Sequence, residues 1–301
     1  MNVMNMANGP MNWIDYQRPR DVSKALKLLE QAEGRGRIVA GGTDLILQLQ
    51  RGQFRADLLV DITGIQELKL IQVEDGWIRI GAGVTHAEVA QNSFIQKEAR
   101  ALADGCSHMG SPQIRNMATL IGNVISAQPA GDGAIPLMAL EAELKVVSRD
   151  GVRWIPLEEA YRGIGVSSVN ASDEVTTEVR FKKLGELGST RFFRMARRRA
   201  LALPVLNGAV AIILNRSRNR IQRARIAIGP VADKPFRPRG AEAFLESEEI
   251  SPETVLEAVR IAGEEANPRT SLLRGSEGYR KEMVKLYLAR TIHQILDETP
   301  R

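Results

Sequence analysis

The stretch Thr119-Leu-Ile-Gly-Asn123 carries the strongest fold signal in this chain, and Ala127-Gln-Pro-Ala-Gly-Asp132 follows it closely. The small residues of the first stretch and the proline and glycine of the second predict two successive turns, the last ending in a carboxylate. A similar segment that exposes its backbone occurs earlier, at Val39-Ala-Gly-Gly-Thr-Asp44. Two such loops predict that a large polar ligand, such as a dinucleotide, lies between them.

The earlier loop has the composition of an anion-binding turn. Gly41 and Gly42 lack a Cβ atom, so their backbone N–H groups can approach a ligand closely. We expect Thr43 to cap a helix that runs to Leu49, and the start of a helix attracts anions such as a pyrophosphate. The pattern is neither G-x-G-x-x-G nor a P-loop, and a glycine pair between a strand and a helix is also compatible with a simple turn.

The later segment offers polar groups for a sugar or a phosphate. Thr119 and Asn123 supply a hydroxyl and an amide, and Gly122 leaves room for close approach. Asp132 is of the residue type that accepts hydrogen bonds from ribose or ribityl hydroxyls. The same carboxylate is equally suited to cap the helix that we expect to begin near Ala134, and both roles are compatible.

The composition excludes several classes of protein. The 301 residues allow about two domains, and the net charge of +5 is spread along the chain except at Arg194-Met-Ala-Arg-Arg-Arg199. Such a run is typical of a solvated face, and an aromatic content of 5% argues against nucleic-acid binding. No apolar run approaches about 18 residues, so we expect no membrane span.

Cysteine and histidine are scarce, which limits the chemistry of the chain itself. Cys106 is the single cysteine, which excludes an internal disulfide and an iron–sulfur cluster, and we expect it in the core. Three histidines without metal-ligand spacing disfavour a metal site, and we expect His108 to be structural or solvent-facing. We identify no catalytic residues, and the absence of acid–base or nucleophilic motifs fits chemistry that belongs to a bound cofactor. The lone cysteine favours a reducing, cytoplasmic location, and residues 1–12 have no signal-peptide pattern and are expected to be loose.

Periodicity and turn residues predict an α+β protein. Strands are expected at 37–40, 58–62, 77–81, 143–148, 153–155, 205–214 and 221–228, and helices at 21–30, 43–49, 85–91, 95–106, 134–142, 252–265 and 276–296. Asp21 and Thr85 are expected to cap their helices. Strands followed by helices in the last part of the chain predict a separate α+β domain there.

The motifs together resemble a known family. Val39-Ala-Gly-Gly-Thr-Asp-Leu45, Gly110-Ser-Pro-Gln-Ile-Arg-Asn116, Ala118-Thr119 with Gly122-Asn123, and Ser126-Ala-Gln-Pro-Ala-Gly-Asp132 occur in order. In these motifs the chain resembles the FAD-binding (medium) subunits of the molybdenum hydroxylases, the group of xanthine dehydrogenase, carbon monoxide dehydrogenase and 4-hydroxybenzoyl-CoA reductase. The resemblance extends from Trp13 to about Leu296.

The resemblance implies a domain organisation. An FAD-binding domain of the vanillyl-alcohol-oxidase type is expected at residues 13–182, with two α/β subdomains of about 13–60 and 61–182. A C-terminal α+β domain is expected at residues 190–297.

The resemblance also implies FAD as the cofactor and a role for each matching residue. The first loop would cradle the pyrophosphate with Ile38, Val39, Ala40, Gly41, Gly42, Thr43, Asp44 and Leu45. Thr119, Gly122 and Asn123 would form the second phosphate and ribityl contact, and Asp132 would bind a ribityl or ribose hydroxyl. Met109 would lie beside the isoalloxazine, and Arg194 stands where the family often has a lysine near the flavin.

Three departures from the family pattern are visible. Ile121 replaces the first glycine of Thr-Ile-Gly-Gly-Asn, and a β-branched residue there resists φ > 0 and adds bulk near the phosphates, which predicts altered or weakened FAD binding. Ala202-Leu-Pro204 replaces an Asp-Ile-Ala triplet. The single cysteine excludes the reductase branch with an extra iron–sulfur cluster in this subunit.

The implied function is electron transfer within a hetero-oligomer. FAD would exchange electrons with the [2Fe-2S] clusters of a small partner subunit and with an acceptor such as NAD⁺ or a quinone, while a large molybdopterin subunit oxidises the substrate. Two alternatives stay open: a degenerate scaffold subunit that has lost FAD, motivated by Ile121, and a stand-alone FAD oxidoreductase of the same fold.

Overall fold

The computed structural model describes residues 13–198 and 201–298, so the expectation for residues 1–12 concerns a segment outside the described residues. The strands are β1 (Trp13–Gln17), β2 (Gly36–Val39), β3 (Ala56–Asp61), β4 (Ile71–Glu74), β5 (Trp77–Gly81), β6 (Glu143–Ser148), β7 (Gly151–Pro156), β8 (Tyr161–Gly163), β9 (Val166–Ser167), β10 (Val175–Lys182), β11 (Gly188–Met195), β12 (Leu206–Leu214) and β13 (Ile221–Gly229). The helices are α1 (Val22–Gln31), α2 (Leu45–Gln50), α3 (His86–Gln91), α4 (Ser93–Glu98), α5 (Arg100–His108), α6 (Pro112–Met117), α7 (Leu120–Ile125), α8 (Ala134–Ala139), α9 (Arg239–Ser247), α10 (Pro252–Glu265) and α11 (Glu277–Glu298). The mixture confirms the expected α+β class.

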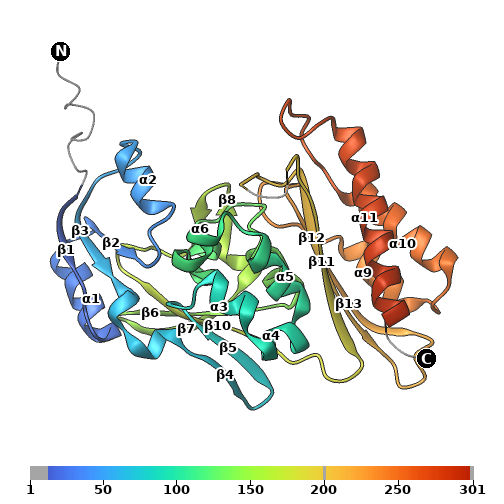
Figure 1. Ribbon diagram of the computed structural model, residues 1–301, viewed down its shortest axis with the longest axis horizontal. Helices are drawn as coiled ribbons and strands as arrows, with labels where there is room; N and C mark the ends of the chain where they lie inside the picture. The colour runs from blue at the N-terminus through green and yellow to red at the C-terminus, as the bar shows by residue number, and fades with distance from the viewer. Residues whose placement is uncertain (1–12, 199–200, 299–301) are drawn as a thin grey trace.

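The first part of the chain forms a small parallel sheet in the order β1-β3-β2, next to α1 and α2 (Figure 1). The helix α1 begins as predicted, because the Asp21 carboxylate accepts a hydrogen bond of 2.7 Å from the backbone N–H of Lys24. Its apolar face buries Ala25 and Leu29. The strand β2 ends at the glycine pair of the first loop, so this sheet positions that loop.

A five-stranded antiparallel sheet follows, in the order β4-β5-β10-β6-β7. The helices α3 to α8 lie between this sheet and the C-terminal part of the chain (Figure 1). The predicted cap Thr85 is confirmed as part of a capping box with Glu88 at the start of α3. The sheet and helices share one large apolar core, so the second loop segment is attached to a rigid body.

The C-terminal part is an antiparallel sheet in the order β11-β12-β13. The helices α9, α10 and α11 cover one face and enclose a second apolar core, while α5 and α8 contact strands of this sheet from the other side (Figure 1). The sheet is therefore shared between two layers of helices, and its strands reach the centre of the molecule.

Some elements differ from the sequence-based expectation. The helix expected at 95–106 is divided at Ala99, whose φ of −145° and ψ of 56° are not helical, into α4 and α5. The sequence-based expectation does not include the strands β1, β4, β8, β9, β10 and β11 or the helices α6, α7 and α9. The second half of β10 alternates buried and charged residues, and β11 buries only Thr190 and Phe193, so the strand signal in the sequence is weak until neighbouring strands are known. Among the described helices, none is both long enough and apolar enough to cross a membrane.

A carboxylate links the two cores. Glu141, just after α8, accepts hydrogen bonds from Arg225 Nε at 2.7 Å and Arg237 Nη1 at 3.1 Å, and it also pairs with Arg223. Partial burial by itself would raise the pKa of Glu141, but the hydrogen bonds and charges of Arg225 and Arg237 outweigh it and lower the pKa to about 2. The ionised form is therefore favoured in the folded state.

This pKa shift predicts a contribution to stability that depends on pH. Because the folded-state pKa lies below the ordinary value of 4.5, the contribution is present above about pH 4.5 and is lost as the pH falls towards about 2. The Glu141→Gln variant should lower the free energy of unfolding at neutral pH and should flatten its decline in acid, measured by urea denaturation. The matched control is Glu186→Gln, at an exposed position between β10 and β11. An identical acid decline in Glu141→Gln and the wild type would contradict the assignment.

Candidate functional site

The first loop connects β2 to α2. The helix begins at Leu45 with Asp44 at the N-cap position, and no side chain makes a capping hydrogen bond, so the prediction that Thr43 caps this helix is wrong. The reason is that Asp44 has already turned to φ −98° and ψ −47°, which places Thr43 outside the helix. In the part of the chain that the structure describes, the N–H groups of Gly41, Gly42 and Thr43 donate no hydrogen bond.

The first loop touches the second segment through backbone. A Cβ atom on Gly41 would lie 2.1 Å from the carbonyl oxygen of Met117 and 2.8 Å from the Cα of Ala118. Only glycine permits this approach, since such distances are far below van der Waals contact. The next residue, Gly42, has a φ of +68° and turns the chain towards α2. Unpaired N–H groups of the first loop therefore lie close to the residues that precede Thr119.

The second segment is a helix start and not the expected turn. Thr119 is the N-cap of α7, and its Oγ1 accepts a hydrogen bond of 3.1 Å from the N–H of Gly122. Gly122 is exposed and Asn123 is half-buried, whereas Thr119 is almost fully buried. Hydrogen bonds between the backbone at residues 84–86 and at residues 118–120 fix the position of this helix start.

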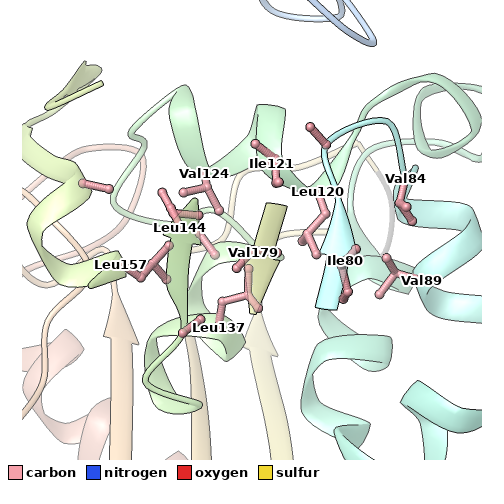
Figure 2. Close-up of a cluster of buried hydrophobic side chains, with 14 of the residues drawn as sticks. Ile80, Val84, Val89, Leu120, Ile121, Val124, Leu137, Leu144, Leu157 and Val179 are labelled. Atoms are coloured by element: carbon pink, nitrogen blue, oxygen red, sulfur yellow. The ribbon is translucent and has the colours of Figure 1, made fainter. Parts of the chain in front are cut away.

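Ile121 lies in the second position of α7, and its side chain points into the core. It is 4% exposed and belongs to the same cluster as Leu120 and Val124 (Figure 2). A helical residue has negative φ, so the expected conflict with φ > 0 does not arise, and a buried side chain adds no bulk to the outer surface of the loop. The expectation that Ile121 strains the segment is therefore wrong.

The third segment, which we define as residues 127–133, contains a buried ion pair. Asp132 is 6% exposed; its Oδ2 lies 3.1 Å from Arg194 Nε, and its Oδ1 accepts a hydrogen bond of 2.7 Å from Asn207 Nδ2. Burial raises the pKa of Asp132, while the charge of Arg194 and the hydrogen bond of Asn207 act against this shift. Asp132 does not cap α8, because the N-cap position is Gly133 and no side chain bonds there.

The remaining candidate residues surround this pair. The Asn123 Oδ1 accepts a hydrogen bond of 3.3 Å from the N–H of Gly133, which ties α7 to the third segment. Arg194 also donates to the carbonyl oxygen of Ala202. Met109 is the C-cap residue of α5 and is half-buried, and its carbonyl oxygen accepts a hydrogen bond of 3.0 Å from Arg115 Nη1. Among the described residues, no hydrogen bond or ion pair joins the first loop to Arg194.

Sequence reasoning missed two buried polar residues beside these segments. Asn207 is fully buried near the start of β12, and the signal was an amide at the head of an otherwise apolar run. His86 is fully buried directly after the capping Thr85, and neither ring nitrogen has a partner among the described residues. Burial, and then the charge of Arg115, lowers the pKa of His86 to about 4, so the ring is neutral at neutral pH. Cys106 is buried in the core as expected, and His108 is exposed as expected.

Two family models match nearly the whole chain. Residues 10–181 match the model described as the FAD binding domain in molybdopterin dehydrogenase. Residues 191–295 match the model described as the CO dehydrogenase flavoprotein C-terminal domain.

Curated relatives align over nearly their whole length. The nicotinate dehydrogenase FAD-subunit of Eubacterium barkeri is 30% identical over 96% of this chain and 98% of its own. The xanthine dehydrogenase FAD-binding subunit of Escherichia coli O157:H7 is 28% identical over 94% of this chain and 96% of its own. The carbon monoxide dehydrogenase medium chain of Hydrogenophaga pseudoflava is 24% identical over 93% of this chain and 96% of its own.

Solved structures have the same fold. A chain of carbon monoxide dehydrogenase from Hydrogenophaga pseudoflava superimposes with a TM-score of 0.86 at 25% identity, over 93% of this chain and 96% of that chain. A chain of quinoline 2-oxidoreductase from Pseudomonas putida 86 gives a TM-score of 0.86 at 24% identity, over 95% of this chain and 98% of that chain. The expected fold is thereby confirmed.

The position of Ile121 predicts a large loss of stability when the side chain is removed. Truncating a buried isoleucine to alanine costs about 2–5 kcal/mol, and a glycine within a helix adds about 1 kcal/mol. The Ile121→Gly variant should lower the free energy of unfolding by the sum of these terms, measured by urea denaturation. The control is Leu256→Gly in α10, where the exposed side chain leaves only the glycine term. Equal losses in the two variants would contradict the burial of Ile121.

Proposed function

Because the chain belongs to the family of FAD-binding subunits of molybdopterin dehydrogenases, we propose that it is the electron-transfer subunit of a molybdenum-containing hydroxylase or dehydrogenase. Electrons would pass between FAD and the [2Fe-2S] clusters of a partner, and then to an acceptor such as NAD⁺ or a quinone. The observation that carries the proposal is the run of unpaired N–H groups at Gly41, Gly42 and Thr43, in a loop whose backbone lies against Met117 and Ala118, just before the N-cap of α7.

The residues present fit FAD. Consecutive N–H groups without an internal partner form a site for phosphate oxygens, and glycine backbone leaves room for them. Ile121 faces the core and leaves the outer surface of α7 free. Bound FAD would supply the redox chemistry, which the side chains of this protein do not provide.

The assignment of roles follows from this fit. The first loop would hold the pyrophosphate through Ile38, Val39, Ala40, Gly41, Gly42, Thr43, Asp44 and Leu45. The other contacts would come from Thr119, Gly122 and Asn123 at the second phosphate and ribityl chain, and from Met109 beside the isoalloxazine. Asp132 would accept a ribityl or ribose hydroxyl in addition to its present bonds, since each carboxylate oxygen can accept two. The charge of Arg194 would oppose the rise that burial causes in the pKa of Asp132, and it would place a positive charge near the flavin.

The proposed domain division is residues 13–182 for FAD and residues 190–297 for the C-terminal domain, with a subdomain boundary near residue 60. It is supported by the ranges of the two family matches and by an apolar core whose members all come from residues after 186. The covalent connection between the proposed domains runs through the turn that separates β10 from β11.

The proposed partners are a small [2Fe-2S] subunit and a large molybdopterin subunit in a cytoplasmic complex. The description of the matching family as part of a molybdopterin dehydrogenase supports this, as does the name "medium chain" of a relative. With a single cysteine, this chain has to receive electrons from clusters held by another chain. The alternative of a scaffold without FAD has lost its motivation, because Ile121 is not strained.

The proposal predicts a flavoprotein that works through partners. The purified chain, after addition of FAD and removal of excess, should have the two visible absorption bands of oxidised flavin. In the complex purified from its native source, substrate oxidised at the large subunit should bleach these bands, and NAD⁺ or a quinone should restore them. A chain that takes up no FAD would contradict cofactor binding. Turnover of a small substrate by the isolated chain would favour the stand-alone alternative.

The proposed role of the first loop predicts that the Thr43 hydroxyl affects FAD affinity without affecting stability. Its hydroxyl has no hydrogen-bond partner in the described ranges, so removing it should cost no stability. If the hydroxyl binds FAD, Thr43→Ala should weaken FAD binding by about 0.5–1.5 kcal/mol, the usual net value of one hydrogen bond. Fluorescence titration with FAD measures this, with Ser217→Ala in the distant β12–β13 turn as the control. Unchanged affinity in Thr43→Ala would remove Thr43 from the site.

A further inference from the structure

The turn that leads to Asp132 is held by the C-terminal sheet. Asn207 Nδ2 on β12 donates to the carbonyl oxygen of Ala130 at 3.1 Å and to Asp132 Oδ1 at 2.7 Å. A single amide thus holds both the backbone and the side chain of the turn, from a position 75 residues further along the chain than Asp132.

A backbone contact on the neighbouring strand supports the same turn. A Cβ atom on Gly229 of β13, which pairs with Asn207, would lie 2.2 Å from the carbonyl oxygen of Pro129. Only glycine lets the turn approach the strand this closely. The turn is therefore seated on two adjacent strands of the C-terminal sheet.

The same turn also holds Asn123, a proposed FAD-binding residue. The N–H of Gly133 donates to Asn123 Oδ1 at 3.3 Å, so the orientation of the Asn123 side chain depends on where the turn lies. A continuous set of contacts thus runs from Asn207 through the turn to Asn123.

Burying the polar side chain of Asn207 in a strand lowers the stability of the folded protein. It is fully buried, its Oδ1 has no hydrogen-bond partner among the described residues, and the adjacent Leu206 belongs to the apolar C-terminal core. A buried unpaired carbonyl oxygen is destabilising, because the group has lost its bonds to water. The two hydrogen bonds that Nδ2 donates offset this loss of stability, and both of them hold the turn.

We propose that Asn207 is a positioning residue for flavin binding, which holds the Ala130–Asp132 turn, and through Gly133 the side chain of Asn123, in the arrangement that receives FAD. The inference rests on the proposed function of the chain. It assigns the C-terminal sheet a part in forming the proposed cofactor site through the turn that it supports. Asn207 is itself fully buried and acts only through the turn.

The test is the affinity of the full-length apoprotein for FAD. Asn207→Ala should weaken FAD binding about tenfold or more, because it releases two hydrogen bonds of the turn together. Asn215→Ala is the matched control: Asn215 lies at the other end of β12, where its side chain bonds within the exposed β12–β13 turn. That variant should lose stability without losing FAD affinity, which separates positioning from a general loss of stability.

A second readout needs no cofactor. In the apoprotein, amide hydrogen exchange at residues 130–133 should become faster in Asn207→Ala, while exchange in α10 stays unchanged. If Asn207→Ala does not fold, Asn207→Ser replaces it, since the shorter side chain leaves a smaller void and still cannot reach Asp132. FAD affinity within about twofold of wild type, or unchanged exchange in the turn of a folded variant, would overturn the inference. Wild-type protein that binds no FAD would instead contradict the proposed function.

Discussion

The structure depends most on one buried carboxylate, Asp132, whose charge has to be compensated by partners from another part of the chain. Asp132 is 6% exposed, and its two oxygens are satisfied by Arg194 and Asn207, which come from strands of the C-terminal sheet. Removing one partner of such a buried pair typically costs about 3–5 kcal/mol, because the remaining charge is left without compensation. The segment from 127 to 133 and the C-terminal sheet therefore have to form together, and the second cross-connection at Glu141 couples the same two parts of the chain.

The proposed cofactor site depends on a second condition, which is the contact of backbone with backbone at Gly41. The carbonyl oxygen of Met117 occupies the space that a side chain at Gly41 would need. This contact brings the unpaired N–H groups of the first loop next to the start of α7, where Thr119 satisfies the helix N-terminus and leaves Gly122 on the surface. The buried Asp132 ion pair and the Gly41 contact together fix the position of the first loop and of α7. The first loop therefore presents unpaired backbone N–H groups, while the apolar core packs against the inner side of α7.

Local signals predicted local structure well. Asp21 and Thr85 cap α1 and α3 as expected, because a capping side chain acts within three residues of its own position. The same type of signal was wrong at Thr43, where Asp44 took the N-cap position, and at residues 119–123, where small residues were interpreted as a turn although Thr119 begins a helix. Ile121 was interpreted through a glycine in the related pattern, and only the helical register shows that its side chain enters the core (Figure 2).

The sequence by itself determined the fold class and the family, and through the family the cofactor, because glycine pairs, caps and motif order are encoded in short stretches of the chain. It also marked the first loop and Asp132 as candidates for the site. Only the tertiary structure decided that Asp132 pairs with Arg194, 62 residues away, and with Asn207, 75 residues away. The physical reason is that a hydrogen bond between distant residues depends on strand register and helix packing, and neither can be deduced from the residue types of the two partners.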